Sequence, residues 1–165
     1  MIEELAASTG QDVKGWDNPG MNFPAFHLIL VAKAIDRLSI KALNDACDLT
    51  IAEWRVLSRL APTEGRTVRE ISETAWVDRA EVSRAAASLE ARGITSRRDN
   101  PLDRRSPVLF VTEQGRELFE RLLPLRAEFY SNLTAGLAQA EYAMLDHLLL
   151  QIARKVTALA DPEAP

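Results

Sequence analysis

The stretch VDRAEVSRAAASLEARGITSRRDNPLDRRSPVLFVT, from Val77 to Thr112, decides the fold. Its first half has the apolar spacing of a helix and bears several arginines, and its second half has the pattern of a β-hairpin with arginines at the tip. A helix fits the major groove of duplex DNA, and a hairpin beside it reaches the neighbouring minor groove or the phosphates. The stretch therefore predicts an element that binds double-stranded DNA.

The charge of the chain is unevenly distributed. The formal net charge is −4, yet the seven arginines between Arg79 and Arg105 stand against four acidic residues, a surplus of +3 that leaves −7 for the rest. The local field governs the encounter with a charged partner more than the net charge does. An acidic body with one basic face is compatible with DNA binding.

Length and composition predict an ordinary globular protein. The chain has 165 residues, of which 47% are hydrophobic and 27% charged, which suits one soluble domain with its own core. The first 20 residues lack the pattern of a signal peptide, and no run of about 18 apolar residues follows. We expect a cytoplasmic protein without a membrane segment.

Catalytic, metal and redox sites have little support in the sequence. There is no glycine-rich phosphate loop, and the two histidines, His27 and His147, are far apart. Cys47, the single cysteine, is flanked by Asp45 and Asp48, whose charges disfavour a thiolate. We expect no enzymatic activity, no cofactor and no metal, and we give a redox role of Cys47 little weight.

The N-terminal part of the chain divides near residue 23. Glycine, proline and polar residues without a sustained period predict a flexible arm over residues 1–22, in which Trp16 is a candidate for docking. From Pro24 the sequence predicts a helix that is apolar on more than one side. It is either a central core helix or, as we favour, a helix whose burial is shared with a second subunit.

Three short helices share one start signal, in which an oxygen-bearing cap residue is followed three positions later by a glutamate, at Thr50–Glu53, Thr67–Glu70 and Asp78–Glu81. The signals predict helices over residues 51–60, 68–75 and 79–92. Only Trp76 to Asp78 separate the last two, which is the helix-turn-helix pattern.

The last of these helices has two different faces. Val82, Ala86 and Leu89 form the face predicted to pack inward. The opposite face carries small residues and long donors, namely Arg79, Ala80, Ser83, Arg84 and Ala87. Gly93 is expected to end the helix in a left-handed conformation.

Trp76 occupies the turn before this helix and leaves two interpretations open. It is either a plug over the core of the lobe, which we favour because aromatic residues bury most of their area, or a partly exposed aromatic residue near the DNA. So bulky a residue argues against a tight left-handed turn at this point.

After Gly93 the sequence predicts strands over residues 94–97 and 107–111, and then a long helix capped by Thr112 that contains Pro124 as a kink. A final helix is expected from about Gln139. The predicted fold class is mainly α with a small β-hairpin (α+β).

Four segments in this order resemble the MarR family of winged helix-turn-helix transcriptional regulators. They are LTIAEWRVL at 49–57, VDRAEVSRAAASLEARGI at 77–94, the wing signature DRRSPVLFVTEQG at 103–115, and the long helix with its proline. The resemblance covers residues 24 to about 160. Val111 stands where the family commonly has leucine, and Trp76 where many helix-turn-helix proteins have glycine.

The resemblance implies a MarR-type domain over residues 23–160. Residues 50–112 would form the winged helix-turn-helix DNA-binding lobe, and residues 23–48 and 113–160 the helices of a homodimer. A two-fold dimer would bind a pseudo-palindromic operator whose half-sites lie about 34–36 Å apart.

Within this architecture Arg105 is expected to enter the minor groove, where narrow A/T-rich segments attract guanidinium groups. Asp103 would hold the wing backbone or pair with a neighbouring arginine. The other expected DNA contacts are Arg79, Ser83 and Arg84 on the recognition helix, Thr67 and Arg69 on the preceding helix, and Arg97, Arg98 and Arg104 in the wing. The opposing interpretation is that these are ordinary solvated charges.

Members of the family often bind small aromatic or phenolic ligands that release the protein from DNA. A cleft for such an effector would involve Phe26, His27 and Trp54, with Arg55 or Arg37 as anion partner. The alternative interpretation, to which we give equal weight, is that Phe26 and Trp54 are core residues and His27 is a satisfied polar group. The rival to a DNA-binding repressor is a winged-helix dimer that binds protein only.

Overall fold

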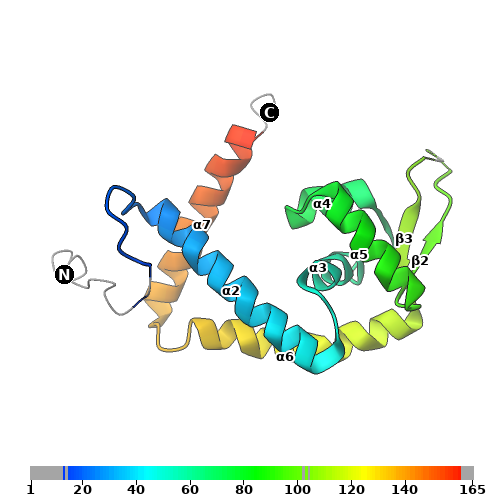
Figure 1. Ribbon diagram of the computed structural model, residues 1–165, viewed down its shortest axis with the longest axis horizontal. Helices are drawn as coiled ribbons and strands as arrows, with labels where there is room; N and C mark the ends of the chain where they lie inside the picture. The colour runs from blue at the N-terminus through cyan, green and yellow to red at the C-terminus, as the bar shows by residue number, and fades with distance from the viewer. Residues whose placement is uncertain (1–12, 14, 102, 104, 161–165) are drawn as a thin grey trace. The chain divides into compact units, whose positions relative to one another are not determined.

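The computed structural model describes residues 13, 15–101, 103 and 105–160, and it is mainly helical with one small antiparallel sheet (Figure 1). The elements are α2 (Pro24–Cys47), α3 (Ile51–Leu60), β1 (Arg66–Thr67), α4 (Val68–Ala75), α5 (Arg79–Ala91), β2 (Thr95–Arg98), β3 (Val108–Val111), α6 (Glu113–Leu133) and α7 (Gln139–Ala160). The chain divides within α6 into two compact units, one up to Phe119 and one from Glu120. The predicted fold class is confirmed.

The three predicted helix starts are confirmed by their caps. The Thr50 hydroxyl accepts a hydrogen bond from the Glu53 amide at 3.1 Å, and the Glu53 carboxylate accepts one from the Thr50 amide at 2.7 Å. Thr67 and Glu70 repeat this capping box at α4. At α5 the Asp78 carboxylate accepts from the amides of residues 80 and 81. Each cap satisfies amides that a helix start leaves without partners, which explains why the helices begin at these residues.

The core of the first unit lies where α3, α4 and α5 pack against one another and against β3. Its buried apolar side chains include Trp54, Val56, Leu57, Leu60, Ile71, Val82, Ala86, Leu89 and Leu109. The inward face predicted for the recognition helix is therefore confirmed. Its other face is exposed at Arg79, Ala80, Ser83, Arg84 and Ala87, as predicted.

The predicted hairpin is present, and its strands belong to a three-stranded sheet of order β1-β3-β2. Thr95 pairs with Val111 and Arg98 with Val108, so each of the two strands begins one residue later than predicted. The third strand, β1, was not predicted. It has only two residues, Arg66 and Thr67, and is too short for a period-two pattern to mark it.

The end of the hairpin is joined to α6 by a close contact that accounts for the threonine and glycine of the wing signature. The Thr112 hydroxyl lies 2.6 Å from the Gly93 carbonyl oxygen and accepts from the Gly115 amide at 3.1 Å. A Cβ atom on Gly115 would lie 2.1 Å from the Ile94 carbonyl oxygen. Only glycine therefore fits here, and Gly93, with φ 70°, has the predicted left-handed conformation.

The structure corrects both expectations for Trp76. The side chain is 67% exposed and does not plug the core. The residue is also left-handed, with φ 54° and ψ 42°, because the chain must leave α4 and enter α5 within a few residues. Its amide and that of Val77 both donate to the Ser72 carbonyl oxygen, which satisfies the end of α4 and offsets a conformational cost of about 1–2 kcal/mol.

The second unit consists of the rest of α6, which contains Pro124, and α7. Arg126 is buried, stacks on the rings of Phe129 and Tyr130, and donates to the Tyr130 hydroxyl at 2.6 Å. In contrast, α7 contains no buried residue. Its large apolar side chains, including Met144, Leu145, Leu148, Leu149, Ile152 and Val156, are all exposed. In the described part of the chain, no helix is long and apolar enough to cross a membrane.

Candidate nucleic-acid interface

The recognition helix α5 is held in place by the buried side chains on its inner face. Val82, Ala85 and Ala86 anchor its inner side, so the exposed side chains of Arg79, Ser83 and Arg84 project from a fixed backbone. Small residues between them, Ala80 and Ala87, leave room for close approach of a groove. The helix can therefore offer hydrogen-bond donors to base edges or phosphates.

A carboxylate that the sequence analysis did not single out organises the arginines of the helix-turn-helix. Glu73 accepts a hydrogen bond from Arg69 at 2.8 Å and lies 3.8 Å from Arg79, so one acid joins α4 to the start of α5. The contact with Arg69 follows from the i,i+4 spacing and could be predicted from the sequence. The contact with Arg79 depends on the left-handed turn at Trp76 and could not be predicted from the sequence.

Thr67, at the start of α4, has its side chain committed to the cap. Its hydroxyl lies 2.7 Å from the Glu70 carboxylate, and its hydrogen bonds lower the pKa of Glu70. The backbone at this helix start, with its dipole, remains the group that is suited to a phosphate.

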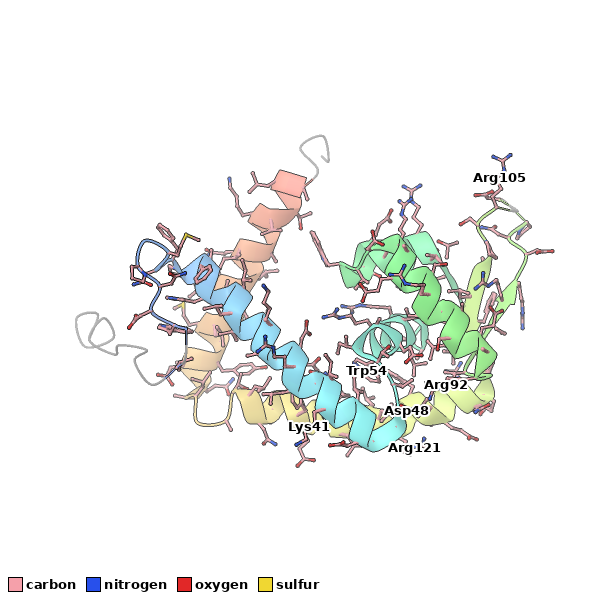
Figure 2. The ribbon with its side chains drawn as sticks, in the orientation of Figure 1. Lys41, Asp48, Trp54, Arg92, Arg105 and Arg121 are labelled. Atoms are coloured by element: carbon pink, nitrogen blue, oxygen red, sulfur yellow. The ribbon has the colours of Figure 1, made fainter. Side chains whose placement is uncertain are left out.

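The wing carries its arginines in three different settings. Arg97 pairs with Glu90 of α5 at 3.1 Å, and the Arg98 guanidinium lies 4.6 Å from the centre of the Phe110 ring. Arg105 is exposed, and Figure 2 shows it projecting from the tip of the hairpin. Arg104 lies outside the described residues. Only the first two arginines are held by neighbouring side chains in the described wing.

The tip of the wing is folded around Asp103. Its carboxylate accepts from the Arg105 amide at 3.0 Å, and its carbonyl oxygen accepts from the Ser106 amide at 3.0 Å. Asn100 donates to the Ser106 carbonyl oxygen at 3.1 Å across the base of the loop. These bonds fix the backbone from which Arg105 extends.

The residues considered for an effector cleft occupy separate environments. Trp54 is 6% exposed and stacks on Phe119, with ring centres 5.9 Å apart. His27 stacks on Trp16 at 4.0 Å, and its Nε2 lies 3.1 Å from the Trp16 carbonyl oxygen, while Phe26 lies at the edge of this pair. Trp16 thus does contact another part of the chain, at the first turn of α2.

The two candidate anion partners also differ. Arg55 is bound to Asp36 through two contacts of 2.9 and 3.0 Å that join α3 to α2. Arg37 is exposed. Among the described residues, no three histidine, cysteine or carboxylate side chains are placed to hold a metal ion.

Similarity to known proteins agrees with this geometry. The sequence profile of the MarR family matches residues 48–106. An HTH-type transcriptional regulator of Bacillus cereus is 30% identical over 64% of this chain and 70% of its own length. The HTH-type transcriptional repressor IacR of Pseudomonas putida is 26% identical over 67% of this chain and 66% of its own.

Solved structures extend the likeness to most of the fold. A MarR/EmrR family transcriptional regulator from Acinetobacter sp. ADP1 has a TM-score of 0.74 and 26% identity over 81% of this chain and 94% of its own. The MarR family regulator Sco3205 from Streptomyces coelicolor, solved in complex with DNA, has a TM-score of 0.75 and 20% identity over 87% and 92% of the two chains. PcaV from the same organism, solved with its natural ligand, has a TM-score of 0.67 and 24% identity over 79% and 94%. With its helix-turn-helix, its wing and these relatives, the chain belongs to the MarR family of transcriptional regulators.

Proposed function

We propose that the protein is a homodimeric repressor in the cytoplasm that binds a pseudo-palindromic operator and is released by a small aromatic ligand. One observation carries the DNA-binding part: an exposed face with Arg79, Ser83 and Arg84 on α5 belongs to the same compact unit as a wing tipped by Arg105. The likeness to Sco3205, which was solved with DNA, and to the repressor IacR supports the same conclusion.

The proposed DNA contacts fall into three groups: the major groove, the minor groove and the phosphates. Arg79, Ser83 and Arg84 contact the major groove, and Arg105 enters the minor groove. Phosphates are bound by the start of α4, at Thr67 and Arg69, and by the wing, at Arg97, Arg98 and Arg104. Arg69 and Arg97 leave Glu73 and Glu90 when they bind phosphate, and the release of condensed counterions from the duplex favours this exchange.

The exposed apolar side chains support the dimer. A long helix without buried residues, such as α7, is unfavourable in water unless another surface covers it. In α2, Ile29, Val31 and Leu38 are also exposed. We assign these helices, within residues 23–48 and 113–160, to a two-fold interface, because a homodimer is the commonest way to cover such faces and also spaces two DNA-binding lobes.

A small-molecule effector is part of the proposal because PcaV, which shares the fold, was solved with its natural ligand. We infer an aromatic ligand from the three ring-bearing residues considered for its site. Arg37, which is exposed, is better placed to receive a ligand carboxylate than Arg55, which must first leave Asp36. Phe26, His27 and Trp54 remain the proposed aromatic contacts. Such a ligand changes the protein only if it binds the DNA-free state more tightly than the DNA-bound state.

The test is a titration against duplexes selected from genomic fragments, at several salt concentrations. Phosphate contacts predict that the logarithm of the affinity falls with the logarithm of salt, with a slope of about −0.9 per phosphate neutralised. Binding that does not depend on salt, or no binding to any duplex, would reject the proposal and favour the winged-helix dimer that binds protein only.

A further inference from the structure

Arg92 differs from the other described arginines of the basic stretch in its contacts, because its guanidinium binds main-chain carbonyl groups at the end of α2. It follows the last residue of α5, and it donates to the Asp48 carbonyl oxygen at 2.9 Å and to the Cys47 carbonyl oxygen at 3.3 Å. Figure 2 shows Arg92 and Asp48 on facing segments. The guanidinium also lies 3.7 Å from the Glu53 carboxylate. Arg92 therefore contacts the end of α2 and the start of α3 from the end of the recognition helix.

Glu53 is the buried counter-charge of this cluster. Its side chain is only 6% exposed, whereas that of Arg92 is 34% exposed. One carboxylate oxygen accepts from the Thr50 amide at 2.7 Å, and the other accepts from the Ser88 hydroxyl of α5 at 2.5 Å. Burial alone would raise the pKa of Glu53, but the bonds from Ser88 and Thr50, with the charge of Arg92, lower it below 4.5. The carboxylate is charged at neutral pH and has donors on both oxygens.

The backbone explains why a cation belongs at this place. Carbonyl groups at the C-terminal end of α2 point out of the helix and carry partial negative charge. Asp48 has φ 53°, so the chain reverses there in a left-handed conformation before α3 begins. A planar guanidinium offers several donors in fixed directions, which lets Arg92 bind two carbonyl groups and face a carboxylate at once.

We infer that Arg92 is a positioning residue, which fixes the recognition helix against the C-terminal end of α2 through Glu53 and the carbonyl groups of residues 47 and 48, and is not a phosphate contact. The inference rests on the proposed DNA binding and deepens it. In the proposed dimer α2 belongs to the interface. This contact therefore determines how a change in the distance between the subunits moves the two recognition helices. A shift of α2 then moves α5 without any change in the residues that contact DNA.

The experiment compares Arg92→Ala, Arg92→Lys, Glu53→Gln and the double variant with Arg59→Ala. Arg59 is an exposed arginine of α3 in the same unit and provides the charge-matched control. Operator affinity is measured at several salt concentrations. Amide hydrogen exchange of α5 and of residues 47–50 is measured without DNA.

We expect Arg92→Ala to weaken operator binding about tenfold with an unchanged salt slope, and to speed exchange in α5. Arg92→Lys should not restore the affinity, because an ammonium group lacks the planar set of donors that the guanidinium offers. Glu53→Gln should weaken binding too, and the double variant should bind no worse than Arg92→Ala, since both act through one cluster. Arg59→Ala should leave the exchange unchanged.

A phosphate contact gives the opposite pattern. Arg92→Ala would then lower the salt slope by about 0.9 per subunit, or about 1.8 for the dimer, lysine would largely restore binding, and Glu53→Gln would have no effect. That result overturns the inference. If the unaltered protein binds no duplex, the proposed function fails, and the exchange data still decide the inference, because unchanged exchange in α5 would contradict it.

Discussion

The DNA-binding lobe and α7 use large apolar side chains in opposite ways. In the lobe, α3, α4 and α5 bury theirs, and the exposed surface of α5 is arginine, serine and alanine. In α7 the large apolar residues are exposed along the whole helix. This contrast indicates that the lobe forms its core without a partner, whereas the exposed apolar residues of α7 favour burial against another surface. The proposed assignment of DNA to one and a second subunit to the other follows from this contrast.

The largest effect is expected in the core of the lobe. Leu57 is fully buried, so Leu57→Ala should lower the free energy of unfolding by about 2–5 kcal/mol, measured by urea denaturation. Leu159→Ala, at an exposed position of α7, provides the control and should cost much less at a protein concentration low enough for the protein to be monomeric. Equal losses of unfolding free energy at the two positions would show that the lobe and α7 do not differ in this way.

The apolar face of α7 is tested by placing a charge on it. Leu148→Glu should shift the protein from dimer to monomer, because an unpaired carboxylate in an apolar interface costs on the order of 2 kcal/mol or more. Sedimentation equilibrium measures the shift. Gln151→Glu adds the same charge to the same helix at an exposed polar residue and should leave the dimer intact. A Leu148→Glu protein that remains dimeric would remove α7 from the interface.

The wing tip should matter for DNA and not for folding. Arg105→Ala removes an exposed guanidinium and should weaken operator binding by about 1–3 kcal/mol, with melting temperature and dimer unchanged. Fluorescence anisotropy on labelled duplex gives the affinity. Unchanged affinity would take Arg105 out of the interface.

Low pH should reduce the free energy of unfolding of the lobe, because Glu53 becomes protonated. Because its pKa is lower in the folded protein than the ordinary 4.5, its contribution is complete above that value and is lost as the pH falls through the folded pKa. Unfolding free energies measured from pH 6 to pH 3 should therefore fall less steeply in Glu53→Gln than in the unaltered protein. Parallel curves would show that Glu53 does not carry this dependence.

Trp76, the exposed aromatic residue of the lobe, gives the smallest expected effect. Glycine adopts its left-handed conformation without strain and alanine does not, so Trp76→Gly should be more stable than Trp76→Ala by about 1 kcal/mol. Thermal unfolding of the two variants measures the difference. A more stable alanine variant would mean that the turn is not strained.

Local signals in the sequence predicted most of the fold. The cap residues at Thr50, Thr67 and Asp78 predicted where helices begin, because capping depends on neighbours in the chain. The spacing of Val82, Ala86 and Leu89 predicted the buried face of α5. Exposed positions for Arg79, Ser83, Arg84 and Arg105 followed from the same periodicity and from the turn-rich wing.

Features that depend on residues far apart in the chain were not predictable. Strand β1 exists only because β3 pairs with it, and the exposure of Trp76 follows from how α4 meets α5. The partners of Arg92 lie 39 to 45 positions away, and no periodic pattern connects them. Sequence alone therefore showed that the stretch is basic, but not that Arg92 contacts residues 47, 48 and 53.

The most direct test of the account is selection of genomic fragments by the unaltered protein, followed by titration of the enriched sequence. We expect one pseudo-palindrome with half-sites about one helical turn apart, bound by two subunits with an affinity that falls as the salt concentration rises. Enrichment of no fragment, or equal affinity for every duplex at every salt concentration, would contradict it.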